Sequence, residues 1–296
     1  MAWLWIVFTL VAAFSQTLRN LVQRGLTGPL GTAGATHVRF FYGLPFGIVF
    51  LATVLLATGQ PLPLPSFTAV AWTAMGALTQ IAATMLMLGA MQSRSFVVVT
   101  AYIKTEPVQV AIFGLVLLGD RLTAPVTLAI VVATLGVVIM SWPKASPGAA
   151  FTWKPTLLGI GSAGLFGLSA VGFRGGILAL GSPSYVVNAS TTLVLSLVIQ
   201  TVVLSLWLVL TRPEVMHAML ASWRLSLPAG FTGAFASQMW FLAFALESAA
   251  RVRTLALVEI FFAQLLAGQL LKQKTGAFDW LGIALVAGGV VLLLNG

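Results

Sequence analysis

The sequence predicts an all-α integral membrane protein of ten transmembrane helices, arranged as two inverted five-helix repeats, and three observations predict it. Its 296 residues are 59% hydrophobic and include only six acidic and fifteen basic side chains, too few for the charged surface of a soluble globule. No Asp, Glu, Lys or Arg occurs from Phe40 to Ser93, which leaves room for two spans of about 20 apolar residues. The third observation is an internal repeat.

The expected spans follow from apolar runs bounded by proline, glycine or charge. They are 3–22, 35–57, 67–91, 96–118, 123–142, 156–175, 184–210, 225–246, 252–271 and 278–294. The segment Gln60–Pro65 contains three prolines and cannot continue a helix, and Arg212 with Pro213 ends the seventh run. The nine loops leave no room for a soluble domain, so we expect function to lie within the membrane.

The repeat appears when the chain is shifted by 153 residues, the spacing between Glu106 and Glu259. The same shift places Ser95 on Ser248 and Gly136 on Gly289, with no gap over the fourth and fifth spans of each half. The predicted repeats are residues 1–148 and 149–296. Because each repeat has an odd number of spans, the two insert in opposite senses, as in secondary transporters whose site lies near the midplane.

Charge and cysteine content exclude several functions. The net charge of +9 comes from basic residues scattered over many segment ends. This distribution is typical of Lys and Arg that fix the orientation of a membrane protein against anionic lipid, so we expect no nucleic-acid partner. The absence of cysteine excludes disulfides and cysteine-ligated metals. The start of the chain has no basic region before its first apolar run, so it is interpreted as the first span and not as a cleaved signal peptide.

Five segments carry recognisable motifs: Glu106-Pro107, Leu117–Leu122, Leu135–Val138, Arg39-Phe40 and Gly282–Val291. They resemble the repeated motifs of the drug/metabolite transporter superfamily, in its EamA-like ten-helix branch. The segment Tyr102–Pro107 and the aromatic-rich helices are most similar to YddG-type exporters of aromatic and other amino acids. The resemblance covers nearly the whole chain and implies the fold more strongly than the substrate. The second half departs from the pattern, because Ile260 stands where the first half has Pro107.

Three ionisable residues are expected deep in the membrane. Glu106 and Glu259 each follow a serine by eleven residues, or about 16 Å of helix, which is the midplane of a hydrocarbon core about 30 Å thick. Lys104 is slightly shallower and needs a partner from another helix or a substrate carboxylate. Arg251 and Arg253 lie near their helix start and are expected to reach headgroups. The structural alternative is that the acids only hold the bundle together.

The fourth span carries a polar stripe. Tyr102, Glu106, Gln109 and Phe113 follow one another at helical spacing and are predicted to line a pore. Pro107 deprives the Ile103 carbonyl of its normal donor, so a hinge is expected there. The alternative is that this proline only shapes helix packing.

Further polar and aromatic side chains complete the predicted substrate site. The candidates are Gln80, Thr84, Asn188, Gln238, Trp240 and Phe262. Together they offer hydrogen bonds to the polar ends of an amino acid and ring contacts to its side chain. Ser15, Gln16, Arg19 and Asn20 are also expected within the membrane, whereas His37 and Arg39, at a helix start, are expected at the interface.

The predicted function is secondary export of small amino acids and related metabolites, especially aromatic and large neutral ones, by alternating access through a central cavity. The alternative in the same superfamily is efflux of drugs or quaternary ammonium compounds, for which carboxylates and rings suffice. An enzyme or receptor is disfavoured, since the chain has no HExxH, GxSxG or metal-ligand spacing. We expect no cofactor and no bound metal. The expected partners are a small-molecule substrate and the lipid bilayer, and the protein is expected to be a monomer.

The expected location is the inner, or plasma, membrane, crossed many times. Ten basic residues fall in odd-numbered loops and four in even-numbered ones, so the positive-inside rule places both termini outside. The family resemblance implies the opposite orientation. A terminal reporter that is active only in the cytoplasm distinguishes the two.

Overall fold

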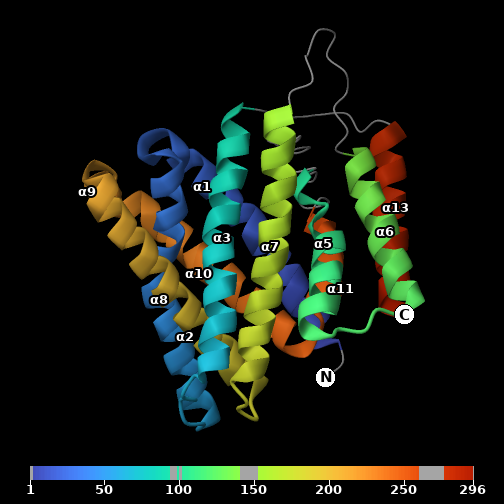
Figure 1. The fold of residues 1–296 in the computed structure, drawn as a ribbon, viewed down its shortest axis with the longest axis horizontal. Coiled ribbons are helices and arrows are strands. Elements are labelled where there is room, and N and C mark those ends of the chain that lie inside the picture. Colours follow the sequence, from blue (N-terminus) through green and yellow to red (C-terminus); the bar gives the residue numbers. More distant parts are fainter. Residues whose placement is uncertain (1–2, 94–98, 100–101, 141–152, 260–276, 296) are drawn as a thin grey trace. The chain divides into compact units, whose positions relative to one another are not determined.

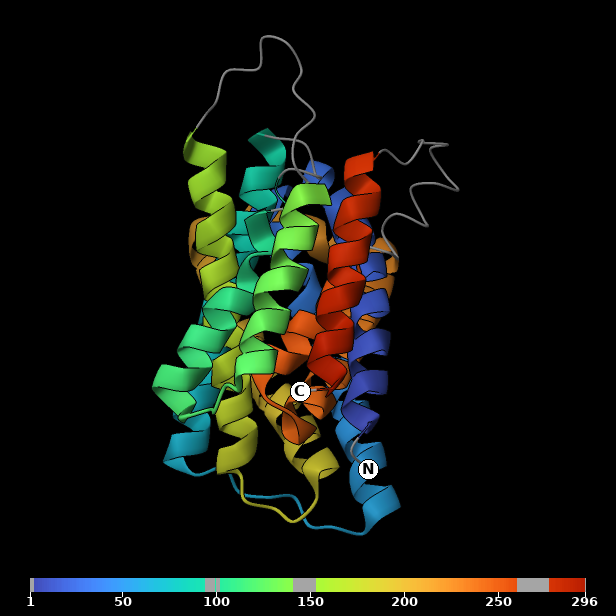
Figure 2. The same ribbon diagram turned by 90° about the vertical axis from the view of Figure 1, so that its right-hand side faces the viewer.

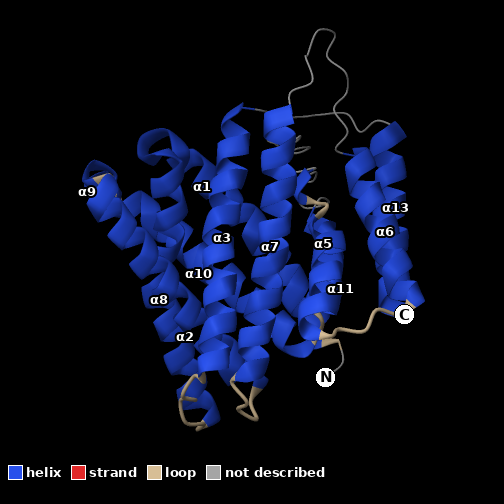
Figure 3. Ribbon diagram, viewed as in Figure 1, coloured by secondary structure: helices blue, strands red, loops and turns tan. Residues whose placement is uncertain are grey.

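The structure is a computed structural model, which describes residues 3–93, 99, 102–140, 153–259 and 277–295. Over these residues every regular element is a helix (Figure 3). The principal helices are α1 (Leu4–Phe41), α2 (Gly43–Thr58), α3 (Phe67–Ser93), α5 (Glu106–Phe113), α6 (Ala124–Met140), α7 (Trp153–Ala179), α8 (Tyr185–Thr211), α9 (Pro213–Ala221), α10 (Trp223–Leu246), α11 (Ala249–Leu255) and α13 (Ala277–Asn295). A π-helical turn, η1 (Gly114–Leu118), extends α5, and a 3-10 turn, η2 (Ala256–Val258), extends α11.

Five helical segments are long and apolar enough to cross a membrane. They are Gly25–Thr58, Phe67–Ala90, Leu157–Ala179, Tyr185–Thr211 and Trp223–Leu246. Three shorter apolar helices are Glu106–Leu118, Ala124–Ile139 and Trp280–Asn295. Over the described residues, the expectation of an all-helical chain with helices long and apolar enough for a membrane is therefore confirmed, while the number ten stays a prediction. Parts of the fourth and ninth expected spans lie outside the described residues.

The expected connection between the first two spans, 3–22 and 35–57, lies within α1. In a straight helix residues 23 and 35 lie about 18 Å apart along the axis. Gln23 Nε2 nevertheless donates to the carbonyl of Ala35 at 2.9 Å, so the chain folds back between them. The fold occurs at Gly31, where φ is 65° and helical dihedrals are interrupted. A glycine takes this left-handed φ without a steric cost, which is why the reversal lies there.

Several other helix ends lie beside glycine or proline residues of the sequence. α2 ends at Thr58 and is capped by Gly59, which has φ of 63°, and α3 starts after the proline-rich segment 60–65. α8 ends at Thr211, and Pro213 then opens the short helix α9, which was not among the expected spans. Proline is suited to a first helical turn because the N–H that it lacks has no helical partner there.

The helices form two compact units, each built from both halves of the sequence (Figure 1). The first unit comprises Met1–Ile81 and Ser169–Glu247, and the second comprises Ala82–Leu168 and Ser248–Gly296. α3 and α7 each contribute one end to each unit. Within the second unit, α6 and α13 run side by side in both views (Figures 1 and 2).

Polar side chains in α8 are buried while large apolar ones are exposed. Ser190 and Thr192 have no exposed surface and Gln200 is 1% exposed, whereas Leu206 is 59% and Leu210 is 74% exposed. A helix in water shows the opposite arrangement. In a bilayer this distribution is favourable, because lipid covers the apolar side and neighbouring helices provide hydrogen bonds to the polar side.

Candidate functional site

Two buried ion pairs join α5 and α11 in the second unit. Lys104 Nζ lies 2.6 Å from Glu259 Oε2, and Arg253 Nε lies 3.1 Å from Glu106 Oε1. All four side chains are between 9% and 12% exposed. The lysine pair has hydrogen-bond geometry, whereas the Arg253 Nε and Glu106 Oε1 atoms are close without being aligned as donor and acceptor. The four residues are called the charge cluster below.

On the α5 side, an irregular stretch of backbone fixes the places of Lys104 and Glu106. Lys104 and Thr105 form a turn after the helical residues 102–103, and Thr105 is the N-cap of α5. The Thr105 hydroxyl donates to the Tyr102 carbonyl at 2.7 Å, which fixes this turn. Pro107 lies in the first turn of α5 and not in the middle of a continuous helix. The irregularity expected from this proline thus precedes it, because proline fits a first turn without losing a hydrogen bond.

On the α11 side the backbone is also irregular just before the glutamate. The Ser248 side chain caps α11 by accepting from the Arg251 N–H. After Leu255 the chain tightens into the 3-10 turn η2, and Glu259 follows directly. Both glutamates therefore adjoin a break in regular α-helix. Such breaks inside membrane helices are tolerated where they are buried in protein or line a polar cavity.

The prediction that Arg253 reaches headgroups was wrong. Its guanidinium is buried and paired with Glu106. The other arginine of this turn, Arg251, donates through Nη2 to the carbonyl of Leu293 at 3.0 Å. A signal for the Arg253 pairing was present, since an acid at the midplane of one helix requires a cation from another. Lys104 and Glu259 meet that requirement for each other.

The polar stripe of α5 packs against α7. A Cβ added to Gly159 would lie 2.7 Å from Tyr102 Cβ, and one added to Gly164 would lie 2.6 Å from Gln109 Oε1. Gly167 in the same way faces Phe113. The predicted pore lining is therefore largely a helix contact: glycines on α7 leave space that these side chains fill. Of the four stripe residues, only Glu106 belongs to the charge cluster.

The remaining site candidates are tied into their own units. In the first unit Gln200 Nε2 donates to Gln80 Oε1 at 2.8 Å, and Gln238 Nε2 donates to Ser190 Oγ at 3.0 Å. Asn188 Nδ2 bonds to the Ser182 carbonyl at 2.9 Å. Thr84, in the second unit, has no exposed surface. Phe262 lies outside the described residues.

The first unit holds a second group of buried polar residues, around α1 and α10. Trp240 Nε1 donates to Gln16 Oε1 at 3.0 Å. Arg19 and Arg39 are each 3% exposed, and His37 has no exposed surface. His37 Nε2 and Ser205 Oγ are 2.9 Å apart. The expectation that His37 and Arg39 lie at the interface was wrong, because the fold at Gly31 brings this segment against α8 and α10.

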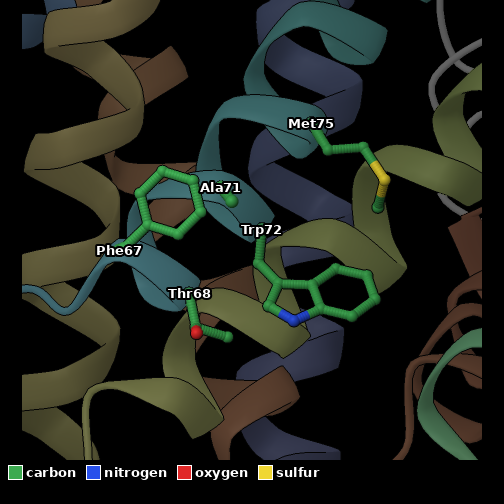
Figure 4. A pocket seen from close by; sticks show the side chains of 5 residues that line it. All are labelled: Phe67, Thr68, Ala71, Trp72 and Met75. Carbon is green, nitrogen blue, oxygen red and sulfur yellow. The ribbon is translucent and has the colours of Figure 1, made fainter.

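A shallow apolar hollow lies on the first turns of α3. It has a volume of about 350 Å³ and is lined by Phe67, Thr68, Ala71, Trp72 and Met75 (Figure 4). Its only polar lining groups are the Thr68 hydroxyl and the Trp72 indole N–H, so it offers little for recognising a charged substrate. In the described part of the chain, no three His, Asp or Glu side chains gather as a metal site.

Comparison with known proteins defines the fold alone. A scan against protein-family models finds no match, and a search of curated proteins finds none either. A solved structure, described only as a crystal structure of a protein, superposes with a TM-score of 0.68. It shares 17% sequence identity over 98% of this chain and 95% of its own. The class that fold and site define is thus an all-α protein with helices suited to a membrane and a buried cluster of paired charges.

Proposed function

We propose that the chain is a secondary transporter that exports amino acids, especially aromatic and large neutral ones, by alternating access. The observation that carries this proposal is the charge cluster: Glu106 and Glu259, which the sequence repeat relates, both lie in it with a cation as partner. Substrate sites of transporters built from inverted repeats lie near the midplane and are typically formed by discontinuous helices, and both glutamates adjoin a break in regular helix.

Burial explains why such charges point to function. An ionised group at the centre of a membrane costs about 2.5–3.5 kcal/mol on insertion scales, so it persists only where it is paired or used. A substrate ammonium is a third cation for the two glutamates. It can replace Lys104 or Arg253 as a partner, and the replacement provides a way to couple substrate binding to movement of α5 relative to α11.

We also propose that the chain is a member of the drug/metabolite transporter superfamily, in the EamA-like branch. The support is the motif resemblance around Glu106, Gly119 and Gly136, together with an all-helical architecture. The inner membrane is the proposed location. These proposals are independent of the substrate, which the fold alone does not identify.

The test is counterflow in proteoliposomes loaded with unlabelled substrate, using Phe, Trp, Met and Thr as a panel. We expect labelled amino acid to accumulate transiently, without ATP. Movement of cationic dyes with no amino-acid counterflow would replace the proposal by drug or quaternary-ammonium efflux. Absence of both would remove transport as the function.

The Glu106→Gln variant links activity to the charge cluster. The amide keeps the shape of the carboxylate and one acceptor oxygen but removes its charge, so we expect counterflow to fall roughly tenfold or more. The matched control is Glu214→Gln, which changes an exposed glutamate in the first turn of α9. Unchanged counterflow in Glu106→Gln would remove this carboxylate from the mechanism.

A further inference from the structure

The charge cluster already provides one carboxylate for each of its cations. Lys104 is bonded to Glu259, and Arg253 is paired with Glu106. An amino acid brings a carboxylate of its own, which needs cationic donors. Two other buried guanidiniums, those of Arg19 and Arg39, occur together in the first unit.

The two arginines converge on one glycine of α10. A Cβ added to Gly233 would lie 2.9 Å from Arg39 Cγ and 3.8 Å from Arg19 Cδ. Since α10 has no side chain at this position, both guanidinium stems can approach its backbone. Arg39 Nη2 lies 3.5 Å from Ser237 Oγ, one turn further along α10, and Arg19 Nη2 donates to Asn20 Oδ1 at 2.9 Å.

A polar edge of α1 completes the surroundings. Gln16, Arg19, Asn20 and Gln23 follow one another at helical spacing, so they share one side of the helix. Gln16 is held by Trp240, whose indole is 3% exposed. Gln16 and Asn20 are themselves half-buried, whereas Arg19 and Arg39 are buried. The group is thus half-buried at its amide edge and buried at its charged end.

The charge of the first unit also favours an anion there. The sequence of this unit contains six arginines and two glutamates. One of the glutamates, Glu214, is exposed at the start of α9. A cationic, water-poor environment attracts anionic ligands, and guanidinium forks match the two oxygens of a carboxylate.

We infer that Gln16, Arg19, Asn20, Arg39, Ser237 and Trp240 form a carboxylate-binding seat, called the arginine seat. Its ligand class is a small carboxylate, and the proposed function supplies the aromatic case. The carboxylate oxygens accept from the two guanidiniums and from the amide N–H groups of Gln16 and Asn20, and Trp240 holds Gln16 in place through its indole N–H. The identification of that ligand as an amino acid rests on the proposed transport function.

The test compares three ligands that share a phenylethyl skeleton, on the purified full chain in detergent, by calorimetric titration. L-Phenylalanine has both charges, 3-phenylpropionate has only the carboxylate, and 2-phenylethylamine has only the ammonium. In Arg39→Gln and Arg19→Gln we expect phenylalanine and phenylpropionate to bind roughly tenfold or more weakly. Binding of phenylethylamine should change less than about twofold, because it has no group for the guanidiniums.

The matched control is Arg174→Gln. Arg174 is a further arginine of the same unit, and its Nη1 donates to the backbone carbonyls of Phe244 and Glu247. Its loss should lower thermal stability and affect all three ligands to the same degree. A second probe, Gly233→Ala, keeps every charge but pushes a methyl group against the Arg39 stem, and we expect it to weaken the two carboxylates by roughly threefold.

The outcomes separate this inference from the proposed function. Full phenylalanine binding and counterflow in both arginine variants would overturn the arginine seat and leave amino-acid transport intact. Arginine-dependent binding of phenylpropionate in a protein that does not bind phenylalanine would support the seat and overturn the amino-acid assignment. Equal loss of all three ligands in Arg39→Gln and in Gly233→Ala would mean that the arginines only hold α1 to α10.

Discussion

The α5 and α11 regions of the second unit contain the same acid at repeat-related positions but obtain their cations differently. In the α5 region the lysine lies two residues before Glu106, whereas in the α11 region the arginine lies six residues before Glu259. The position related to Lys104 is Leu257, and the position related to Arg253 is Thr100. The acids therefore follow the repeat and the cations do not.

Each cation pairs with the glutamate of the other region. Lys104 reaches Glu259, and Arg253 reaches Glu106. Each region thus has one acid and one base, and exchanging partners between helices neutralises both without requiring the same spacing in each. A repeat relates backbones, while the charge balance needs only that opposite charges meet.

The largest expected effect concerns loss of one cation. Arg253→Met should destabilise the purified protein by about 3–5 kcal/mol, because Glu106 is left buried without its partner. Lys104→Met should have a similar effect through Glu259. Thermal denaturation in detergent measures both. The double variant Arg253→Met with Glu106→Gln should recover much of the loss; additive losses would show that the two residues do not interact.

The second expected effect is on the glycine contacts between α6 and α13, where Gly136 and Gly289 are separated by the same 153 residues as Glu106 and Glu259. A Cβ on Gly136 would lie 2.8 Å from the Gly282 carbonyl and the Val286 nitrogen, and one on Gly289 would lie 2.7 Å from Ala133 Cβ. Backbone atoms cannot move aside easily, so Gly136→Ala and Gly289→Ala should each cost about 1–3 kcal/mol.

The control for these alanines is Gly288→Ala, since a Cβ at Gly288 meets nothing within 4 Å. It should be neutral or slightly stabilising, because alanine favours helix over glycine. If Gly288→Ala destabilises as much as Gly289→Ala in thermal denaturation, helix contact is not the reason for the glycine. Unequal losses in Gly136→Ala and Gly289→Ala would show that the two glycine contacts are not equivalent.

The smallest expected effect is at the contact between α5 and α7. A Cβ on Gly164 would lie 2.6 Å from Gln109 Oε1, which is the far end of a flexible side chain. Gly164→Ala should therefore cost less than about 1 kcal/mol, because the amide can rotate away. A cost as large as that of Gly136→Ala in the same denaturation assay would mean that Gln109 is held rigidly, as expected of a residue that positions the charge cluster.

Some site residues were predictable because their signal is local. Glu106, Glu259 and Lys104 stand out as charges far from the ends of apolar runs, and depth follows from counting residues at a fixed rise. Arg253 and Arg39 were misplaced because they lie near helix starts, where a long side chain ordinarily reaches the interface. Their burial depends on which neighbouring helices approach them.

The sequence by itself determined that the chain is helical, that helices long and apolar enough for a membrane are present, and that proline and glycine end them near residues 59, 119 and 212. Those features depend on hydropathy, on turn chemistry and on the φ that glycine alone adopts readily, all of which act within a few residues. Only the tertiary structure decided that Lys104 meets Glu259, that Arg253 meets Glu106, and that Arg19 and Arg39 converge on Gly233. Such pairings depend on the rotation and separation of helices far apart in the chain, which are set by the packing of many side chains together.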